Sequence, residues 1–267
     1  MRIRINELPA QTEAGVTIGA LAERHKPGAD VLILNGFPTS SETVLKEGDE
    51  LFLIRRGEQP GRDELEGLMA ARHTPGVHRR LKAACVGIAG AGGLGSAVAV
   101  ALARVGVGRL VVADFDVVEP SNLNRQQYFI DQIGHPKVEA LAANLLRINP
   151  YVAVEAHTTL LDPVNIPQIF SACCIVVEAF DRADMKAMLV DTVLSRMNGV
   201  TVVAASGLAG YGPNNAITTR KVASRLYLCG DGSSEAQPGN GLMAPRVAIA
   251  AGHQANQVLR IILGEEK

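Results

Sequence analysis

An apolar stretch that ends in glycines and leads directly into small residues restricts the fold of this chain most. Residues 84–106 read ACVGIAGAGGLGSAVAVALARVG, which predicts a buried strand, a tight turn and a closely packed helix. Gly90, Gly92 and Gly95 match G-x-G-x-x-G, a pattern that lets a phosphate approach the backbone. Asp114 ends the next apolar stretch, about 24 residues after Gly90, where an acid can hold ribose hydroxyls. This segment predicts a nucleotide site, with NAD as the default ligand.

The chain beyond Asp114 alternates between helical and extended patterns. Helices are expected at 136–149, 182–198 and 245–263, and strands at 151–160, 173–181 and 199–207. This alternation predicts an α/β fold with a Rossmann-like, mostly parallel sheet and flanking helices. Ligands of such sheets bind outside the carboxyl ends of the strands. The glycine turn, Asp114, the loop 121–126 and Asp181 are therefore expected to meet at one edge of the sheet.

The residues expected at this edge suit phosphate chemistry better than hydride transfer. Arg125 and Lys137 supply cations, Asn122 and Asn124 supply neutral amides, and Asp181 supplies a carboxylate. Cations that are already in position stabilise the charge that develops on a phosphate under attack. Mg²⁺ prefers one or two carboxylates together with phosphate oxygens. The set therefore favours adenylyl transfer from a nucleotide.

A smaller domain is expected at residues 1–57, followed by a helical linker at 58–80 and the nucleotide domain at 81–267. The first segment reads as strand, strand, helix, strand, strand, with Thr17 capping the helix, which predicts a β-grasp (ubiquitin-like) domain. VLILNG and LKEGDELFLIRRG resemble the ubiquitin-like sulfur carriers of the ThiS and MoaD type. Those carriers react through a free C-terminal Gly-Gly. Because the chain continues after Gly57, this domain is expected to be a docking or regulatory relic.

The second domain carries a more specific resemblance. GAGGLGS, DFDVVEPSNLNRQQYF, GHPKVEA, RINP and VVEAFDRADMK are similar, in this order, to the ThiF/MoeB/HesA family, relatives of ubiquitin-activating enzymes. The resemblance implies a homodimer that uses ATP and Mg²⁺ to adenylylate the Gly-Gly carboxylate of a ThiS-like sulfur carrier. By the family's pattern, Gly90, Gly92, Gly93 and Gly95 wrap the phosphates, Asp114 holds the ribose, Asn122, Arg125 and Lys137 stabilise the transferring phosphate, Asp181 binds Mg²⁺, and Arg72 reaches the partner's site.

Several of these residues also have a purely structural interpretation. Arg125 could pair with Asp114 or Asp116, and Lys137 could be an ordinary surface lysine of its helix. Asp181 could cap the helix that follows it. Arg72, in the same way, could belong to an amphipathic linker helix.

Composition excludes some classes of protein. None of the four cysteines forms a CxxC pair, so no zinc site is expected, and Cys229 is expected to be a packed thiol. The net charge of −1 and the absence of tryptophan disfavour a nucleic-acid partner. No signal segment or membrane-spanning stretch is visible, which predicts a cytoplasmic protein without a membrane partner.

The leading functional interpretation is adenylylation of a ThiS-like carrier, in the synthesis of the thiamine thiazole. Three alternatives stay open. The glycine turn and Asp114 are compatible with an NAD-dependent oxidoreductase. The fused β-grasp domain is compatible with a non-catalytic regulator whose carrier groove it fills. Some relatives adenylate a small-molecule or tRNA-borne carboxylate instead.

Overall fold

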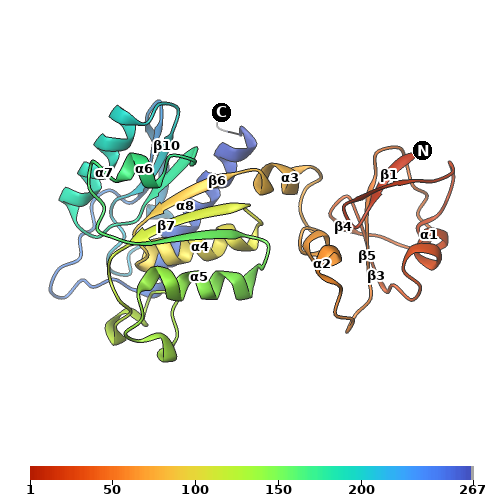
Figure 1. Ribbon diagram of the computed structural model, residues 1–267, viewed down its shortest axis with the longest axis horizontal. Helices are drawn as coiled ribbons and strands as arrows, with labels where there is room; N and C mark the ends of the chain where they lie inside the picture. The colour runs from red at the N-terminus through yellow and green to blue at the C-terminus, as the bar shows by residue number, and fades with distance from the viewer. Residues whose placement is uncertain (266–267) are drawn as a thin grey trace. The chain divides into compact units, whose positions relative to one another are not determined.

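The computed structural model describes residues 1–265, except for the side chains of Arg62 and Asp63. The chain divides into two compact units, Met1–Arg79 and Arg80–Lys267, and each is described by itself (Figure 1). The predicted linker at 58–80 contains the helix α2 (Arg62–Met69) and the start of α3 (Val77–Lys82), which ends two residues beyond it. The first of these helices belongs to the N-terminal unit.

The N-terminal unit is built on a mixed sheet with the strand order β2-β1-β5-β3-β4. Its elements are β1 (Arg2–Ile5), β2 (Leu8–Gln11), α1 (Ile18–His25), β3 (Val31–Leu34), β4 (Phe37–Pro38) and β5 (Glu50–Ile54). β1 and β5 are parallel, whereas β1 with β2 and β3 with its two neighbours are antiparallel. This arrangement confirms the small N-terminal sheet domain predicted from the sequence.

Local sequence explains several of these elements. The Thr17 side chain accepts a hydrogen bond from the backbone N–H of Ala20, which confirms the predicted helix cap. The segment ELPAQT forms the edge strand β2, which agrees with the second strand of the predicted order, whereas NGFPTS, which has the composition of a turn, also contains the short edge strand β4. The strand β5 is apolar and buried at its three central positions, because both of its faces are covered.

The second unit is an α/β structure around a sheet of order β11-β12-β10-β9-β6-β7-β8. Its strands are β6 (Cys85–Ala89), β7 (Arg109–Asp114), β8 (Ala153–Thr158), β9 (Ile175–Glu178), β10 (Thr201–Ala205), β11 (Thr218–Ala223) and β12 (Leu226–Gly230). Its helices are α4 (Gly93–Arg104), α5 (Lys137–Ile148), α6 (Ile166–Ile169), α7 (Ala183–Arg196) and α8 (Ala244–Leu263), with 3-10 turns η1 (Pro120–Asn122), η2 (Ile130–Gln132) and η3 (Asn214–Ala216). All neighbouring strands are parallel except β11 and β12.

Helices cover both faces of this sheet. α4, α5 and α8 pack on one face, and α6 and α7 cover the other (Figure 1). The strand order reverses between β6 and β9, since the chain runs from β6 outward to β8 and then returns to the other side of β6. Gly87 in β6 lets the buried Phe170 ring lie directly against the strand, where a Cβ atom would collide with it. The predicted Rossmann-like architecture is confirmed.

One strand end and two whole strands differ most from the predictions. The strand expected to end at Asp181 ends three residues earlier, at Glu178, whose side chain accepts the backbone N–H of Phe180 where the strand ends. β11 and β12 were not among the expected strands. Within residues 1–265, no helix combines the length and apolar character that crossing a lipid bilayer requires.

Candidate nucleotide-binding site

The second unit contains a pocket of about 700 Å³ at the carboxyl ends of its parallel strands, beside the point where the strand order reverses. This is where open α/β sheets bind their ligands. Each strand end contributes part of the lining. The residues that the later argument uses are Gly90, Gly92, Gly93, Asp114, Asp116, Arg125, Gln126, Lys137, Asp181 and Lys186.

The glycine turn forms one wall of this pocket. Gly90 has a φ of +97°, and a Cβ atom there would lie 2.9 Å from the carbonyl oxygen of Ala179. At Gly95 a Cβ atom would collide with the carbonyl oxygen of Gly90. Gly92, by contrast, faces open space and has only the Gln126 amide at 3.9 Å. The turn is thus packed backbone against backbone on one side and left open for an anion on the other, at the uncapped start of α4.

Asp114 holds this turn in place. One carboxylate oxygen accepts the backbone N–H of Ala91 at 2.6 Å, and the other accepts the backbone N–H of Asp116 at 2.8 Å. The buried Tyr128 hydroxyl donates to the carbonyl oxygen of Ala91 at 2.6 Å, and burial raises the pKa of this phenol. Each Asp114 oxygen keeps acceptor capacity for a ribose hydroxyl.

The predicted cations both line the pocket, and neither structural alternative fits. Arg125 donates to the carbonyl oxygen of Ser121 at 3.1 Å and to the Asn124 side chain at 2.8 Å. Within the described chain it has no ion pair with either nearby aspartate, so the pairing alternative is wrong. Lys137 is 6% exposed, with its ammonium group 2.8 Å from the Asp116 carboxylate, so it is not a surface lysine.

Asp181 presents an exposed carboxylate to the same pocket. The N-cap residue of α7 is Arg182, and no side chain caps this helix within residues 1–265, so the capping alternative for Asp181 is wrong. The described residues also offer the Asp181 carboxylate no hydrogen bond or ion pair. A lone, unengaged carboxylate beside a phosphate site fits Mg²⁺, which takes its other ligands from phosphates and water. No cluster of three or more acidic, histidine or cysteine side chains suited to a metal occurs among the described residues.

An ion pair between Glu178 and Lys186, which lie on either side of Asp181 in the sequence, was not predicted. Glu178 is fully buried, and the Lys186 ammonium lies 3.0 Å from both of its carboxylate oxygens. Lys186 also donates to the carbonyl oxygen of Ala205 at 3.1 Å, and Glu178 accepts the backbone N–H of Phe180 at 2.7 Å. Burial raises the pKa of Glu178, against the pull of the ammonium group. The pair joins the ends of β9 and β10 and fixes the start of the segment that carries Asp181.

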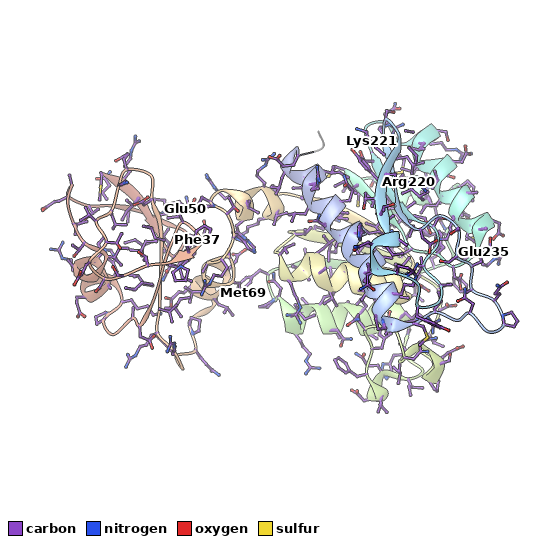
Figure 2. All side chains as sticks on the ribbon, turned by 180° about the vertical axis from the view of Figure 1, so that it is seen from behind. Phe37, Glu50, Met69, Arg220, Lys221 and Glu235 are labelled. Carbon is purple, nitrogen blue, oxygen red and sulfur yellow. The ribbon has the colours of Figure 1, made fainter. Side chains whose placement is uncertain are left out.

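A second ion pair, between β12 and α8, lies next to the pocket-lining residues 232–236. Asp231 lies at the end of β12 and binds Arg246 of α8 at 2.6 Å. Burial would raise the Asp231 pKa, but hydrogen bonds from Ser234, Ser233 and Arg246 together lower it well below its usual range. The loop that follows includes Glu235, labelled in Figure 2, which lines the pocket.

Three predicted residues do not line the pocket. Asn122 is buried within its own loop, where its side-chain oxygen accepts the backbone N–H of Glu119 in a capping box, and its predicted role toward the phosphate stays a prediction. Gly95 serves the packing of α4. Arg72 belongs to the N-terminal unit and is exposed in the turn after α2, which ends at Met69, so the expectation that it lies on a helix is wrong.

Two further residues lie beside predicted ones but were not singled out from the sequence. Gln126 is 8% exposed and lines the pocket, and its side-chain oxygen has no partner in the described part of the protein. Ser96 donates to the carbonyl oxygen of Gly92 at 2.6 Å and accepts the backbone N–H of Gln127. The run NRQQY, next to the predicted Arg125, was the available signal for this side of the pocket.

The fold and the pocket define an α/β nucleotide-binding domain of the doubly wound class, with cations and a free carboxylate beside the phosphate turn. Comparison with known proteins then gives the family. The model of the ThiF family matches residues 67–267, and that of the ThiS-like ubiquitin family matches residues 1–57. The chain belongs to the ThiF family and carries an N-terminal ThiS-like ubiquitin domain.

The chain is also similar in sequence to several named proteins. The chain is 41% identical over 125 residues to the SAMP-activating enzyme E1 of Haloferax volcanii, an alignment that covers 46% of each chain. It is 30% identical over 192 residues to the molybdopterin-synthase adenylyltransferase of Escherichia coli, covering 70% of this chain and 76% of the relative. Against several other relatives, including the Haloferax enzyme, this chain spans about half of the relative's length.

Solved structures show the same fold. The structure of Escherichia coli tRNA N6-threonylcarbamoyladenosine dehydratase in complex with ATP superimposes with a TM-score of 0.67 at 23% identity. The superposition covers 74% of this chain and 93% of that structure. At this identity the likeness establishes the architecture of the second unit.

Proposed function

We propose that this protein is an ATP-dependent adenylyltransferase that activates the C-terminal carboxylate of a ubiquitin-like sulfur carrier. The observation that carries the proposal is the convergence of separate chain segments on one pocket. The open side of the glycine turn, Asp114, Arg125, Lys137 and Asp181 all line it. The named adenylyltransferase relatives and the ThiS-like domain support the same reaction class.

The reaction needs few protein groups. A carrier carboxylate oxygen attacks the α-phosphorus of ATP, the bond from this phosphorus to the bridging oxygen breaks, and pyrophosphate departs with both electrons. The carrier then ends in an acyl-adenylate. Negative charge moves onto the equatorial oxygens and the leaving group, so fixed cations contribute most, about 3 kcal/mol for each well-placed donor.

Each pocket residue has a role in this scheme. The uncapped start of α4 receives phosphate oxygens, and Asp114 receives the ribose. Arg125 and Lys137 stabilise the developing charge. Asp181 holds Mg²⁺, which supplies further positive charge to the phosphates when it is bound.

The decisive measurement is intact mass of a carrier after incubation with the protein, ATP and Mg²⁺, together with ATP–pyrophosphate exchange. We expect an AMP adduct on a carrier that ends in Gly-Gly and none on the same carrier without its last glycine. Absence of both adduct and exchange with every ubiquitin-like carrier tested would overturn the proposal. Calorimetry that gives tighter binding of NADH than of ATP would favour an oxidoreductase instead.

The natural carrier is proposed to be ThiS-like, in thiamine thiazole synthesis. The support is the ThiS-like ubiquitin domain in the same chain. The relatives act in other systems by name, so carriers of several types belong in one competition experiment. If a MoaD-type carrier is adenylylated many-fold faster than a ThiS-type carrier, the thiamine assignment fails and the adenylylation proposal stands.

The active form is proposed to be a homodimer in which Arg72 acts on the partner's site. The exposure of Arg72 in a turn leaves its guanidinium available for this role. Arg72→Ala and Lys137→Met chains, each inactive alone, should regain roughly a quarter of wild-type activity when they are mixed and allowed to exchange subunits, since half of a mixed dimer's sites are intact. If Arg72 acts within its own chain, mixing restores nothing.

A further inference from the structure

The sheet of the N-terminal unit is covered on both faces. Successive residues of a strand point to opposite faces, so Leu51 and Leu53 of β5 pack with α1, whereas Phe52 lies on the other face. A carrier domain that used one face of this sheet for an outside protein would leave that face apolar and exposed. Here Phe52 is 3% exposed and Ile33, on the same face, is 2% exposed.

The cover on this second face is the segment that follows Gly57. Leu68 of α2 and Ala71 of the following turn pack on Ile33 and Phe52. A Cβ atom on Gly67 would lie 2.8 Å from the carbonyl oxygen of Asn6, in the turn between β1 and β2, so the helix lies directly against the backbone of this turn. Close contact of this kind requires glycine and indicates a specific docking of α2 (Figure 1).

Polar contacts fix the same segment. Glu64 of α2 accepts hydrogen bonds from the Lys26 ammonium at 2.6 Å and from the Asn6 side chain at 3.0 Å. The Lys26 ammonium also pairs with Glu58 at 3.2 Å. Lys26 is the C-cap residue of α1, and its side chain is only 12% exposed. Its two ion pairs therefore connect Glu58 and Glu64 of this segment to the end of α1.

Gly57 itself is a turn residue in this arrangement. It has a φ of +77°, a conformation that glycine adopts easily, and the chain reverses there toward α2. The residue before it, Arg56, donates its backbone N–H to the Asp30 side chain at 2.9 Å. The position that would be a free, extended end in a carrier is held against the domain.

We propose that residues 58–73 are a built-in ligand of the ThiS-like sheet. They make the N-terminal unit a closed module whose second sheet face is unavailable to another protein, and they use Gly57 as a turn rather than as a reactive end. The domain is therefore not a substrate of the pocket in the second unit. The inference rests on contacts within the N-terminal unit and does not depend on the proposed enzymatic function.

Hydrogen exchange measured by mass spectrometry on the full chain tests this proposal. In the wild type, amides of α2 should exchange far more slowly than those of an unstructured peptide. Gly67→Leu should remove that protection and speed exchange in β3 and β5 by about tenfold, while exchange in α1 changes less than about twofold. The variant should also bind the dye ANS, because the apolar face becomes exposed.

Gly61→Leu is the matched control, because a Cβ atom there meets nothing within 4 Å. It should leave exchange in the sheet unchanged. If Gly67→Leu also unfolds α1, Gly67→Ala supplies a milder test. Alanine stabilises an isolated helix by about 1 kcal/mol relative to glycine, so helix propensity alone predicts slower exchange in α2. The docking contact predicts faster exchange, because the added Cβ atom would collide with the Asn6 carbonyl oxygen. Free exchange of α2 in the wild type, or greater protection of α2 in Gly67→Ala, would overturn the proposal.

Discussion

Lys137 allows the sharpest test of the pocket, since its ammonium pairs with a neighbouring acid and is proposed to act on phosphate as well. Its ammonium lies 2.8 Å from the Asp116 carboxylate, with a side chain 8% exposed, and both residues line the pocket. Lys137→Met keeps the buried methylene stem in an apolar side chain of similar length, so the fold should persist. The loss of one preorganised cation should lower kcat/KM on the order of 10²-fold.

A further loss comes from Asp116. Without Lys137, its carboxylate faces the phosphates unpaired. Two charges 4 Å apart interact by about 1 kcal/mol in water and about 4 kcal/mol near a protein surface. The Asp116 side chain is 48% exposed, which favours the lower end, about 1 to 2 kcal/mol or roughly tenfold in rate. Lys137→Met should therefore lose about 10³-fold in total, and adding Asp116→Asn should recover about tenfold.

ATP–pyrophosphate exchange at saturating carrier, over a range of ATP concentrations, measures kcat/KM for the wild type, both single variants and the double variant. Arg147→Met, at the exposed far end of α5, is the control and should be close to wild type. A double variant no faster than Lys137→Met would refute the repulsion argument. Full activity of Lys137→Met would refute the role of Lys137 in phosphate chemistry.

Three further changes probe the supports of the pocket. Glu178→Gln leaves the Lys186 ammonium without its charge partner. We expect the free energy of unfolding to fall by about 3 kcal/mol and Tm to fall by roughly 6–12 °C. An unchanged Tm in calorimetry would contradict the buried pair. Asp231→Asn should lower Tm at pH 7 but progressively less as the pH falls below about 4, because a carboxylate with a lowered pKa stabilises the fold only while it is ionised; a pH-independent difference would rule this out. Gly95→Ala must displace the Gly90 carbonyl, so titration calorimetry should show weakened ATP binding, and wild-type affinity would disprove the packing role.

The sequence was most informative where one short segment determines its own conformation. Gly90 needs a positive φ and Gly95 needs a close backbone contact, so their spacing alone identifies the turn and the helix after it. Asp114 ends a strand whose buried interior is continuous in the sequence. Residues at the ends of parallel strands meet at one edge whatever their separation along the chain, so the order of strands and helices is enough to predict that Asp181 and Asp114 line the same pocket.

Features that depend on tertiary partners were not readable in this way. In the sequence, Glu178 looks like any acid at the end of an apolar strand. Only the fold shows that it pairs with Lys186, which lies about one turn into α7. Asn122 matched the family's pattern, but only the fold shows that its side-chain oxygen also accepts a hydrogen bond from the backbone of Glu119 in the same loop. The β11 strand was missed because it is mostly exposed and polar at the edge of the sheet, without alternating apolar residues.

The cysteines bear on whether sulfur is transferred through a thiol of the second unit. A persulfide needs an accessible thiolate near the activated carboxylate. Cys229 is fully buried, and burial raises its pKa, so it is a packed thiol as predicted. Cys174 is exposed, but it precedes β9, at the amino edge of the sheet, whereas the pocket lies at the carboxyl edge. The strand between them spans about 13 Å. Sulfur transfer to an adenylylated carrier in this pocket is therefore expected to use a thiol other than Cys174 and Cys229, and Cys174→Ser should leave adenylylation and sulfur transfer unchanged when both are assayed with an external donor.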